Sequence, residues 1–163
     1  MKPLPRNLAL RKSEPADHAR IIAVMTDWWG GRDLRSSVPR LFLNHFCDTS
    51  FVAEKDGELV AFLVGFLSPA RPDEGYIHFA GIHPAYRKIG LGRHLFETFF
   101  DLCRKNGRRV VRSCTSPVNR GSVSFHQCIG FSIEPGNSIA DGIPVTVDYN
   151  RPGDPKVRFV KQL

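Results

Sequence analysis

Apolar residues along the chain recur at two spacings, one typical of strands and the other of helices. Strands are expected where apolar positions alternate or run together, at residues 7–12, 50–54, 58–67, 76–82, 109–115, 131–134 and 157–160. Helices are expected from Ser13 toward Met25 and over residues 39–46, 91–105 and 119–129. The remainder is rich in glycine, proline and polar residues, including 135–154, which has room for a short strand at 145–147.

The order of these elements predicts an α/β fold with a mixed sheet. Asp56-Gly57 is a hairpin signal, so the strands on either side of it are expected to be antiparallel. Strand–helix–strand units in the second half predict parallel neighbours. The strand at 58–67 is apolar almost throughout, which is typical of a central strand covered on both faces. The length of 163 residues favours a single domain, residues 1–163.

Composition is that of an ordinary soluble globular protein, with 42% apolar and 24% charged residues. The net charge of +7 suits a nucleic acid, an anionic membrane or a phosphorylated small molecule, although a generally basic surface explains it equally well. The four cysteines lack metal-ligand spacing, so free thiols and no metal are expected. There is no apolar leader, and the longest uncharged apolar run, Leu59 to Ala70, is too short to cross a bilayer. We therefore expect a cytoplasmic protein without membrane contact.

The segment from Ile82 to Arg93 carries the clearest chemical signal. A strand ends there, and a turn with Gly90 and Gly92 opens an amphipathic helix. Amides at a helix N-terminus lack partners and carry a partial positive charge, and glycine lets a ligand approach them closely. Phosphate suits such a turn. Eight basic and two acidic residues between Pro84 and Arg112 hold most of the net charge, which favours a local polyanion site.

Several phosphate-binding and catalytic motifs are absent, and another family fits instead. Leu95 stands where a dinucleotide fingerprint needs its third glycine, and neither a P-loop nor a G-x-S-x-G elbow occurs. Arg87-x-x-Gly90-x-Gly92 resembles the acyl-CoA pyrophosphate loop of the GNAT N-acetyltransferase superfamily. Asn119-x-x-Ser122-x-x-Phe125-His126-x-x-x-Gly130-Phe131 resembles the downstream signature of that family, Asn-x-x-Ala-x-x-Leu/Phe-Tyr-x-x-x-Gly-Phe. The resemblance covers residues 7–163.

The resemblance implies a GNAT-like fold and a site for acetyl-CoA. The fold is a mixed sheet of six to seven strands flanked by about four helices, with two splayed parallel strands, 76–82 and 109–115, that admit the pantetheine arm. The main chain of Ile82 and His83 is expected to pair with the arm. The residues expected at the pyrophosphate are Arg87, Lys88, Ile89, Gly90, Leu91, Gly92 and Arg93, through main-chain amides and the three basic side chains, although those side chains are otherwise ordinary solvated charges. Asn119 is expected to contact the pantetheine region, to cap its helix, or both.

The implied chemistry is transfer of an acetyl group from the thioester to a neutral amine. The Ile82 amide is expected to stabilise the oxyanion. His126 stands where the family has a tyrosine acid, and is either the acid that protonates the thiolate or a structural or CoA-contacting histidine. His78 is the candidate base, because with a period of two it shares a face with Ile82 and Tyr76; the alternatives are a satisfied strand histidine and a water as base.

The acceptor site is the least defined part of the prediction. The family places the loop between the first two helices beside it, where Trp28 and Trp29 are expected to form an aromatic wall and Arg32 to bind an acceptor carboxylate, with Tyr76 nearby. The alternatives are core packing for the tryptophans and solvation for the arginine, and residues 137–148 are a second candidate rim.

Three kinds of function and one kind of assembly stay open at this point. An N-acetyltransferase acting on a small-molecule or protein amine leads. The alternatives are a CoA-binding sensor without catalysis and a basic nucleic-acid module, although no recognition signature for nucleic acid is present and no nucleic-acid partner is expected. A homodimer is possible if the final strand is an exposed edge.

Overall fold

The computed structural model describes residues 6–163 of the chain. Nine strands form in chain order: β1 (Leu8–Lys12), β2 (Phe51–Lys55), β3 (Glu58–Leu67), β4 (Glu74–Ile82), β5 (Val110–Thr115), β6 (Ser132–Ile133), β7 (Ser138–Ala140), β8 (Ile143–Val145) and β9 (Val157–Gln162). The four α-helices are α1 (Asp17–Val24), α2 (Arg40–His45), α3 (Leu91–Lys105) and α4 (Arg120–Cys128). Four short 3-10 helices join them: η1 (Asp27–Trp29), η2 (Arg35–Ser37), η3 (Cys47–Thr49) and η4 (Pro84–Tyr86).

A seven-stranded mixed sheet organises the molecule, in the order β1-β2-β3-β4-β5-β9-β6. Only β4 and β5 run parallel, and the other pairs in the sheet are antiparallel. The predicted mixed sheet and its buried interior strand β3 are therefore confirmed. The idea of an exposed final strand is wrong, because β9 pairs with β5 on one side and with β6 on the other.

Smaller expectations about element positions also need correction. The first helix begins at Asp17, because residues 14–16 form a turn rather than helix. The predicted strand at 145–147 lies two residues earlier, as β8, and pairs with an unpredicted β7 in a separate two-stranded sheet. Strand β4 begins at Glu74, two residues before the predicted start, since Glu74 and Gly75 already pair with Val110 and Val111.

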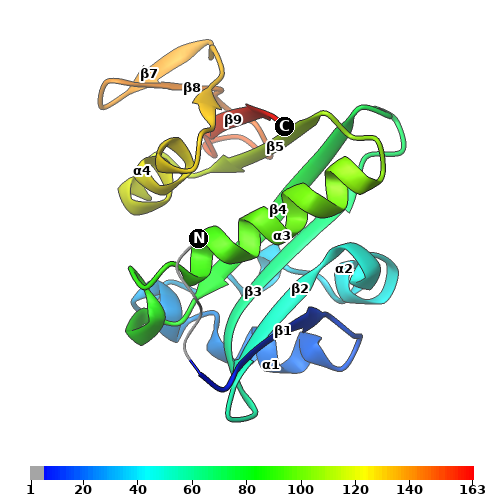
Figure 1. Ribbon diagram of the computed structural model, residues 1–163. Helices are drawn as coiled ribbons and strands as arrows, with labels where there is room; N and C mark the ends of the chain where they lie inside the picture. Colours follow the sequence, from blue (N-terminus) through cyan, green and yellow to red (C-terminus); the bar gives the residue numbers. More distant parts are fainter. Residues whose placement is uncertain (1–5) are drawn as a thin grey trace.

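Two apolar cores cover the two faces of the sheet. Helix α3 lies across one face (Figure 1), where its Leu95 and Phe99 are fully buried and the helix packs on β3 and β4. Helices α1 and α2 cover the other face, where Ile21 and Leu43 pack against Phe62 of β3. Figure 1 shows α4, β5, β9 and the β7–β8 hairpin gathered on one side of α3.

The parallel pair β4–β5 separates along its length. The two strands pair from Glu74↔Val110 to Ile77↔Ser113, and the Ser113 hydroxyl donates to the Ile77 carbonyl at 3.1 Å. Beyond that point β4 continues to Ile82 and β5 to Thr115 without pairing with each other, although each stays paired with its other neighbour. The predicted splay of two parallel strands is therefore present, and the unpaired segments border a wedge between them.

Candidate functional site

The turn before α3 presents a row of unpaired amides. Lys88 and Gly90 both have left-handed backbone, with φ of +66° and +94°. The first helical hydrogen bond of α3 runs from the His94 amide to the Gly90 carbonyl, at 3.0 Å. Within residues 6–163, the amides from Lys88 to Arg93 have no protein acceptor. Such a run of donors at the N-terminus of a helix is a site for an anion, above all a phosphate.

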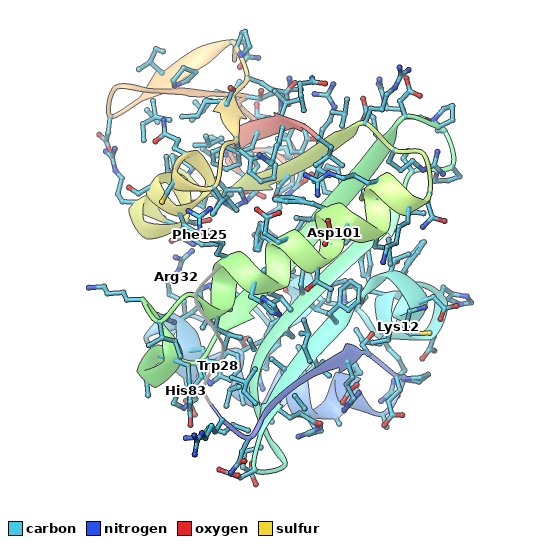
Figure 2. The ribbon with its side chains drawn as sticks, in the orientation of Figure 1. Lys12, Trp28, Arg32, His83, Asp101 and Phe125 are labelled. Atoms are coloured by element: carbon cyan, nitrogen blue, oxygen red, sulfur yellow. The ribbon has the colours of Figure 1, made fainter. Side chains whose placement is uncertain are left out.

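Gly92 has a packing role, in addition to the binding role predicted for it. A Cβ atom at this position would lie 3.2 Å from the Phe125 ring and 3.7 Å from the Ile82 side chain. Phe125 lies between α4 and the first half of α3 (Figure 2). The glycine therefore lets α4 approach the turn, in addition to leaving its amide accessible.

The basic side chains near the turn are used unequally. Lys88 is exposed beside the free amides, and Arg93 donates to the Cys128 carbonyl at 3.1 Å. Arg87 is exposed but folds back onto the main chain, where it donates to the Ile82 carbonyl at 3.1 Å and to the Trp28 carbonyl at 2.6 Å. Arg87 thus braces the loop, and a phosphate contact from it stays a prediction for its remaining donors only.

The charge concentration expected around the turn is only partly there. Arg104 lies in the last turn of α3, about 20 Å from its start at 1.5 Å per residue, and Arg109 and Arg112 follow before and within the first residues of β5. There they pair with Asp101, Asp73 and Glu74 at 2.8, 3.2 and 3.0 Å. Nearness in sequence therefore overstated the local charge.

Of the two residues expected to pair with the pantetheine arm, only Ile82 has its amide free for it. The His83 amide donates to the Val60 carbonyl at 2.9 Å, and the His83 carbonyl accepts from Tyr86 at 2.8 Å. Because antiparallel neighbours alternate, the Val60–His83 hydrogen bond turns the amide of Ile82 away from β3 and toward the wedge. The His83 amide is therefore engaged with β3, and the Ile82 amide is left as the donor at the wedge.

A β-bulge places His78 on the opposite face from Ile82. Val64 pairs with Phe79 while Gly65 pairs with Ile77, so His78 is an extra residue in β4. Ile82 packs toward α3, whereas the His78 ring stacks on Phe42 of α2, with 4.1 Å between centroids. The shared face predicted from period two is therefore wrong.

His78 is nevertheless held as a neutral imidazole with one free nitrogen. Its Nε2 lies 2.7 Å from the Ser37 carbonyl and donates to it. Burial lowers the pKa of His78 below its usual 6.5. The lone pair then resides on Nδ1, which leaves a proton acceptor on the α1–α2 side of the sheet.

His126 is packed in a core and is poorly arranged to act as an acid. Its side chain is buried, and its ring stacks on Phe159 with 4.3 Å between centroids. Nδ1 lies 2.8 Å from the Ser122 carbonyl and donates to it, so the buried Nε2 carries a lone pair, and it has no partner within the described chain. Burial lowers the pKa of His126 to about 4. A neutral imidazole with this hydrogen bond has no proton at Nε2 to give, so the geometry supports the structural alternative.

A cavity of about 330 Å³, here called the Arg32 cavity, opens beside the loop between α1 and α2. Its lining comes from that loop, from the residue after β5 and from the segment before β9: Arg32, Leu34, Ser36, Ser37, Ser116, Asn150, Arg151, Asp154 and Lys156. Through Ser37 it adjoins His78. Arg32 is therefore at a cavity, as predicted, but the second wall is 150–156 rather than 137–148.

Both tryptophans pack against the sheet instead of lining this cavity. Trp28 is 5% exposed, stacks on Phe62 and meets the edge of His83 (Figure 2), so it belongs to the core. Trp29 is half-buried against Phe79. The predicted aromatic wall is therefore wrong for Trp28.

Two other predicted site residues, Tyr76 and Asn119, do not line the Arg32 cavity. Tyr76 lines a second cavity of about 410 Å³, and its hydroxyl lies 3.5 Å from the Cys114 sulfur. Burial raises the pKa of Tyr76 well above 10, so the phenol stays protonated. The Asn119 side chain accepts from the Ser122 amide at 3.2 Å, which confirms its capping role; a contact with pantetheine stays a prediction.

Sequence reasoning missed most of the Arg32 cavity. Ser116, Arg151, Asp154 and Lys156 belong to segments that carry no motif, and only the pairing of β5 with β9 brings those segments together.

No helix in residues 6–163 combines the length and apolar character that crossing a bilayer requires. The same residues contain no cluster of three or more His, Cys, Asp or Glu side chains placed to hold a metal.

Comparison with known proteins gives one consistent match. The sequence model of the acetyltransferase (GNAT) family matches residues 16–131. An L-2,4-diaminobutyric acid acetyltransferase of Nocardia farcinica is 29% identical over 89 residues, which are 55% of this chain and 46% of that protein. The chain spans about half the length of the curated relatives it matches.

Solved structures share the fold. A GNAT-family protein from Desulfovibrio desulfuricans superposes with a TM-score of 0.74 at 20% identity, covering 95% of this chain and 98% of that one. A diaminobutyrate acetyltransferase from Paenibacillus lautus, in complex with L-2,4-diaminobutyric acid and coenzyme A, has a TM-score of 0.68 at 20% identity and coverages of 94% and 93%.

Proposed function

Because the chain belongs to the GNAT acetyltransferase family, we propose that it transfers an acetyl group from acetyl-CoA to a primary amine by direct attack in a ternary complex. The observation that carries the proposal is the run of free amides from Lys88 to Arg93 beside a wedge between two parallel strands. The first feature suits a diphosphate and the second an extended arm. Together they aim a thioester toward the middle of β4.

The residues present fit acetyl-CoA as the donor substrate. The turn amides and the exposed Lys88 would hold the pyrophosphate. The Ile82 amide, directed into the wedge, would donate to the thioester oxygen as negative charge develops there. Acetyl-CoA supplies the activated acetyl group, and the protein supplies position and a stabilising donor.

We assign proton removal from the acceptor amine to His78. Only a neutral amine attacks, and the lowered pKa of His78 keeps its Nδ1 unprotonated near neutral pH. The ring is fixed between Phe42 and the Ser37 carbonyl, and Ser37 also lines the Arg32 cavity. The His78 ring therefore lies next to the Arg32 cavity, and its role as the base requires the acceptor amine to reach Nδ1, the ring nitrogen that does not bond Ser37. His126 receives a structural role, and the departing thiolate takes its proton from solvent at the open wedge.

The acceptor is proposed to be a small molecule. The Arg32 cavity, at about 330 Å³, lies at the lower end of the size range of small-molecule sites. The curated and structural relatives named for diaminobutyric acid have acceptors of this size, which supports the same class here.

The test measures thiol release from acetyl-CoA over a panel of small amines, together with calorimetric binding of acetyl-CoA. His78→Gln is expected to lower kcat by about 100-fold and to leave acetyl-CoA affinity unchanged. His126→Gln is expected to keep kcat within about threefold, after any loss of stability is checked by thermal unfolding. The reverse ranking of the two variants would overturn the assignment.

The pH profile separates the base from a packing role. The base works in its neutral form, so kcat/KM should rise with pH through the pKa of His78, at a value below 6.5. This rise in kcat/KM should be absent in His78→Gln. A rise at higher pH that comes from deprotonation of the acceptor amine should remain. Binding of acetyl-CoA without turnover on any amine would instead support the sensor alternative.

A further inference from the structure

We propose that the acceptor carries an anionic group, of the carboxylate class, which the guanidinium groups of Arg32 and Arg151 hold in the Arg32 cavity while the amine faces His78. This inference deepens the proposed function and rests on it. It starts from the charges that line the cavity and from the partners that those charges already have.

The carboxylates nearest to the two arginines are engaged elsewhere. The carboxylate of Asp33, which is next to Arg32 in the chain, forms an ion pair with the guanidinium of Arg35 at 2.7 Å. Asp154 accepts from Lys156 at 2.6 Å and from Asn150 at 3.3 Å. Among residues 6–163, no acidic group lies within ion-pair distance of Arg32 or Arg151. The cavity therefore has an Asp154–Lys156 pair and two guanidinium groups without a direct ion pair. The pKa of Asp154 is lowered mainly by Lys156 and to a smaller extent by the charge of Arg151, so Arg32 is the less compensated of the two arginines.

The rest of the lining is polar and close to neutral. Ser36, Ser37, Ser116 and Asn150 add hydroxyl and amide groups, and Leu34 is the single apolar member of the lining. Such a cavity gains little from an apolar acceptor. A carboxylate meets a planar guanidinium through paired, charge-assisted hydrogen bonds, which fix orientation as well as affinity.

The geometry also sets where the reacting amine lies. His78 lies next to the cavity, because its Nε2 donates to the carbonyl of Ser37, a residue of the lining. Ile82 lies farther along β4, on the opposite face of the sheet. An acceptor held at Arg32 and Arg151 by its anion presents its amine toward His78 only if a few bonds separate the two groups. The predicted class is thus a compact amino acid, rather than a polyamine or a protein tail.

The experiment compares ω-amino acids, from glycine to 6-aminohexanoate, with their primary amides, and adds ornithine and lysine with theirs. Thiol release gives kcat/KM for each acid and for its amide. The two members of a pair differ only in the carboxylate charge. We expect the acids to exceed their amides by about tenfold or more, with one preferred chain length. The excess should appear mainly in KM, because the carboxylate does not change during the reaction.

Variants locate the recognition. Arg32→Gln and Arg151→Gln are each expected to reduce the acid-to-amide ratio by about tenfold, and Arg32→Glu to bring it below one. The matched control is Arg40→Gln, which should leave the acid-to-amide ratio unchanged. Arg40 is an exposed arginine at the start of α2 and does not line the cavity. A ratio near one in the wild type, or a ratio that Arg32→Glu does not alter, would overturn the inference while leaving acetyl transfer intact.

A binding measurement keeps the two proposals separable. Calorimetry of the best amino acid against the protein saturated with coenzyme A needs no turnover. Binding that the amide lacks and that Arg32→Glu removes would uphold the anion site even if no amine is acetylated, in which case the transferase proposal alone fails. Absence of both binding and preferential turnover overturns the anion site.

Discussion

The two ends of helix α3 are both basic, yet their charges are used in opposite ways. At the N-terminal end, Lys88 is exposed and six consecutive amides, from Lys88 to Arg93, lack protein acceptors among the described residues. At the C-terminal end, Arg104 is paired with Asp101, and Arg112 lies between Glu74 and Glu134. One end stabilises the fold, and the other leaves donors free for a ligand. Unsatisfied donors, rather than charge density, mark the binding end.

The largest expected effect comes from placing a negative charge among the free amides. Gly92→Glu should weaken acetyl-CoA binding by about 100-fold or more, since its carboxylate competes for the donors and repels the diphosphate. Calorimetry measures the affinity. Gly92→Ala is the control, because its Cβ meets Phe125 at 3.2 Å without adding charge, and it should lose far less. Equal losses in both variants would mean that packing, not the anion site, is disturbed.

Substitutions near the C-terminal end of α3 should lower the stability of the fold and leave acetyl-CoA binding unchanged. Arg112→Met leaves Glu74 and Glu134 without their shared partner, and is expected to lower the free energy of unfolding by about 1–3 kcal/mol. Chemical denaturation gives this value. Acetyl-CoA affinity of the folded variant should match the wild type. A fall in affinity comparable to that of Gly92→Glu would break the division between the two ends.

A matched pair of lysines gives a smaller and cleaner contrast. Lys88→Glu and Lys105→Glu make the same charge change at opposite ends of α3, and both residues are exposed. The first is expected to weaken acetyl-CoA binding by about tenfold and the second by no more than about twofold. Similar losses at both positions would show that the overall charge, rather than the turn, governs binding.

Salt should produce the smallest effect. Raising ionic strength from about 0.05 to 0.3 M is expected to weaken acetyl-CoA binding by a few-fold, because exposed Lys88 and Arg93 are screened while the amides are not. Lys88→Gln should show a shallower dependence than the wild type. A steep dependence that survives in Lys88→Gln would assign the screening to other cations.

The contrast between His78 and His126 follows the same logic as the contrast between the ends of α3. Both rings are buried to a large extent, both donate to a main-chain carbonyl, and burial lowers the pKa of both. They differ in their surroundings: His126 is enclosed by Phe96, Phe125, Phe131 and Phe159, whereas His78 lies next to Ser37, a residue that lines the Arg32 cavity. Access to a cavity therefore decides which histidine is offered as the base.

The sequence by itself determined the local part of this protein. Apolar spacing places α3 and most strands within a few residues, and the Gly90–Gly92 turn marks the proposed anion site, because backbone conformation and helix-end amides depend on neighbours in the chain. The spacing of Arg87, Gly90 and Gly92 also indicated the family to which the chain belongs. Each of these features is encoded within a dozen residues.

Only the tertiary structure decided which side chains meet. The bulge that moves His78 to the α2 side arises from the register of β4 against β3, and a single inserted residue reverses the face expected from alternation. The Arg32 cavity joins residues 32–37, 116 and 150–156, and Arg104 to Arg112 find their partners at the far end of α3. Pairing partners, register and burial depend on segments distant in the chain, so local patterns do not contain them.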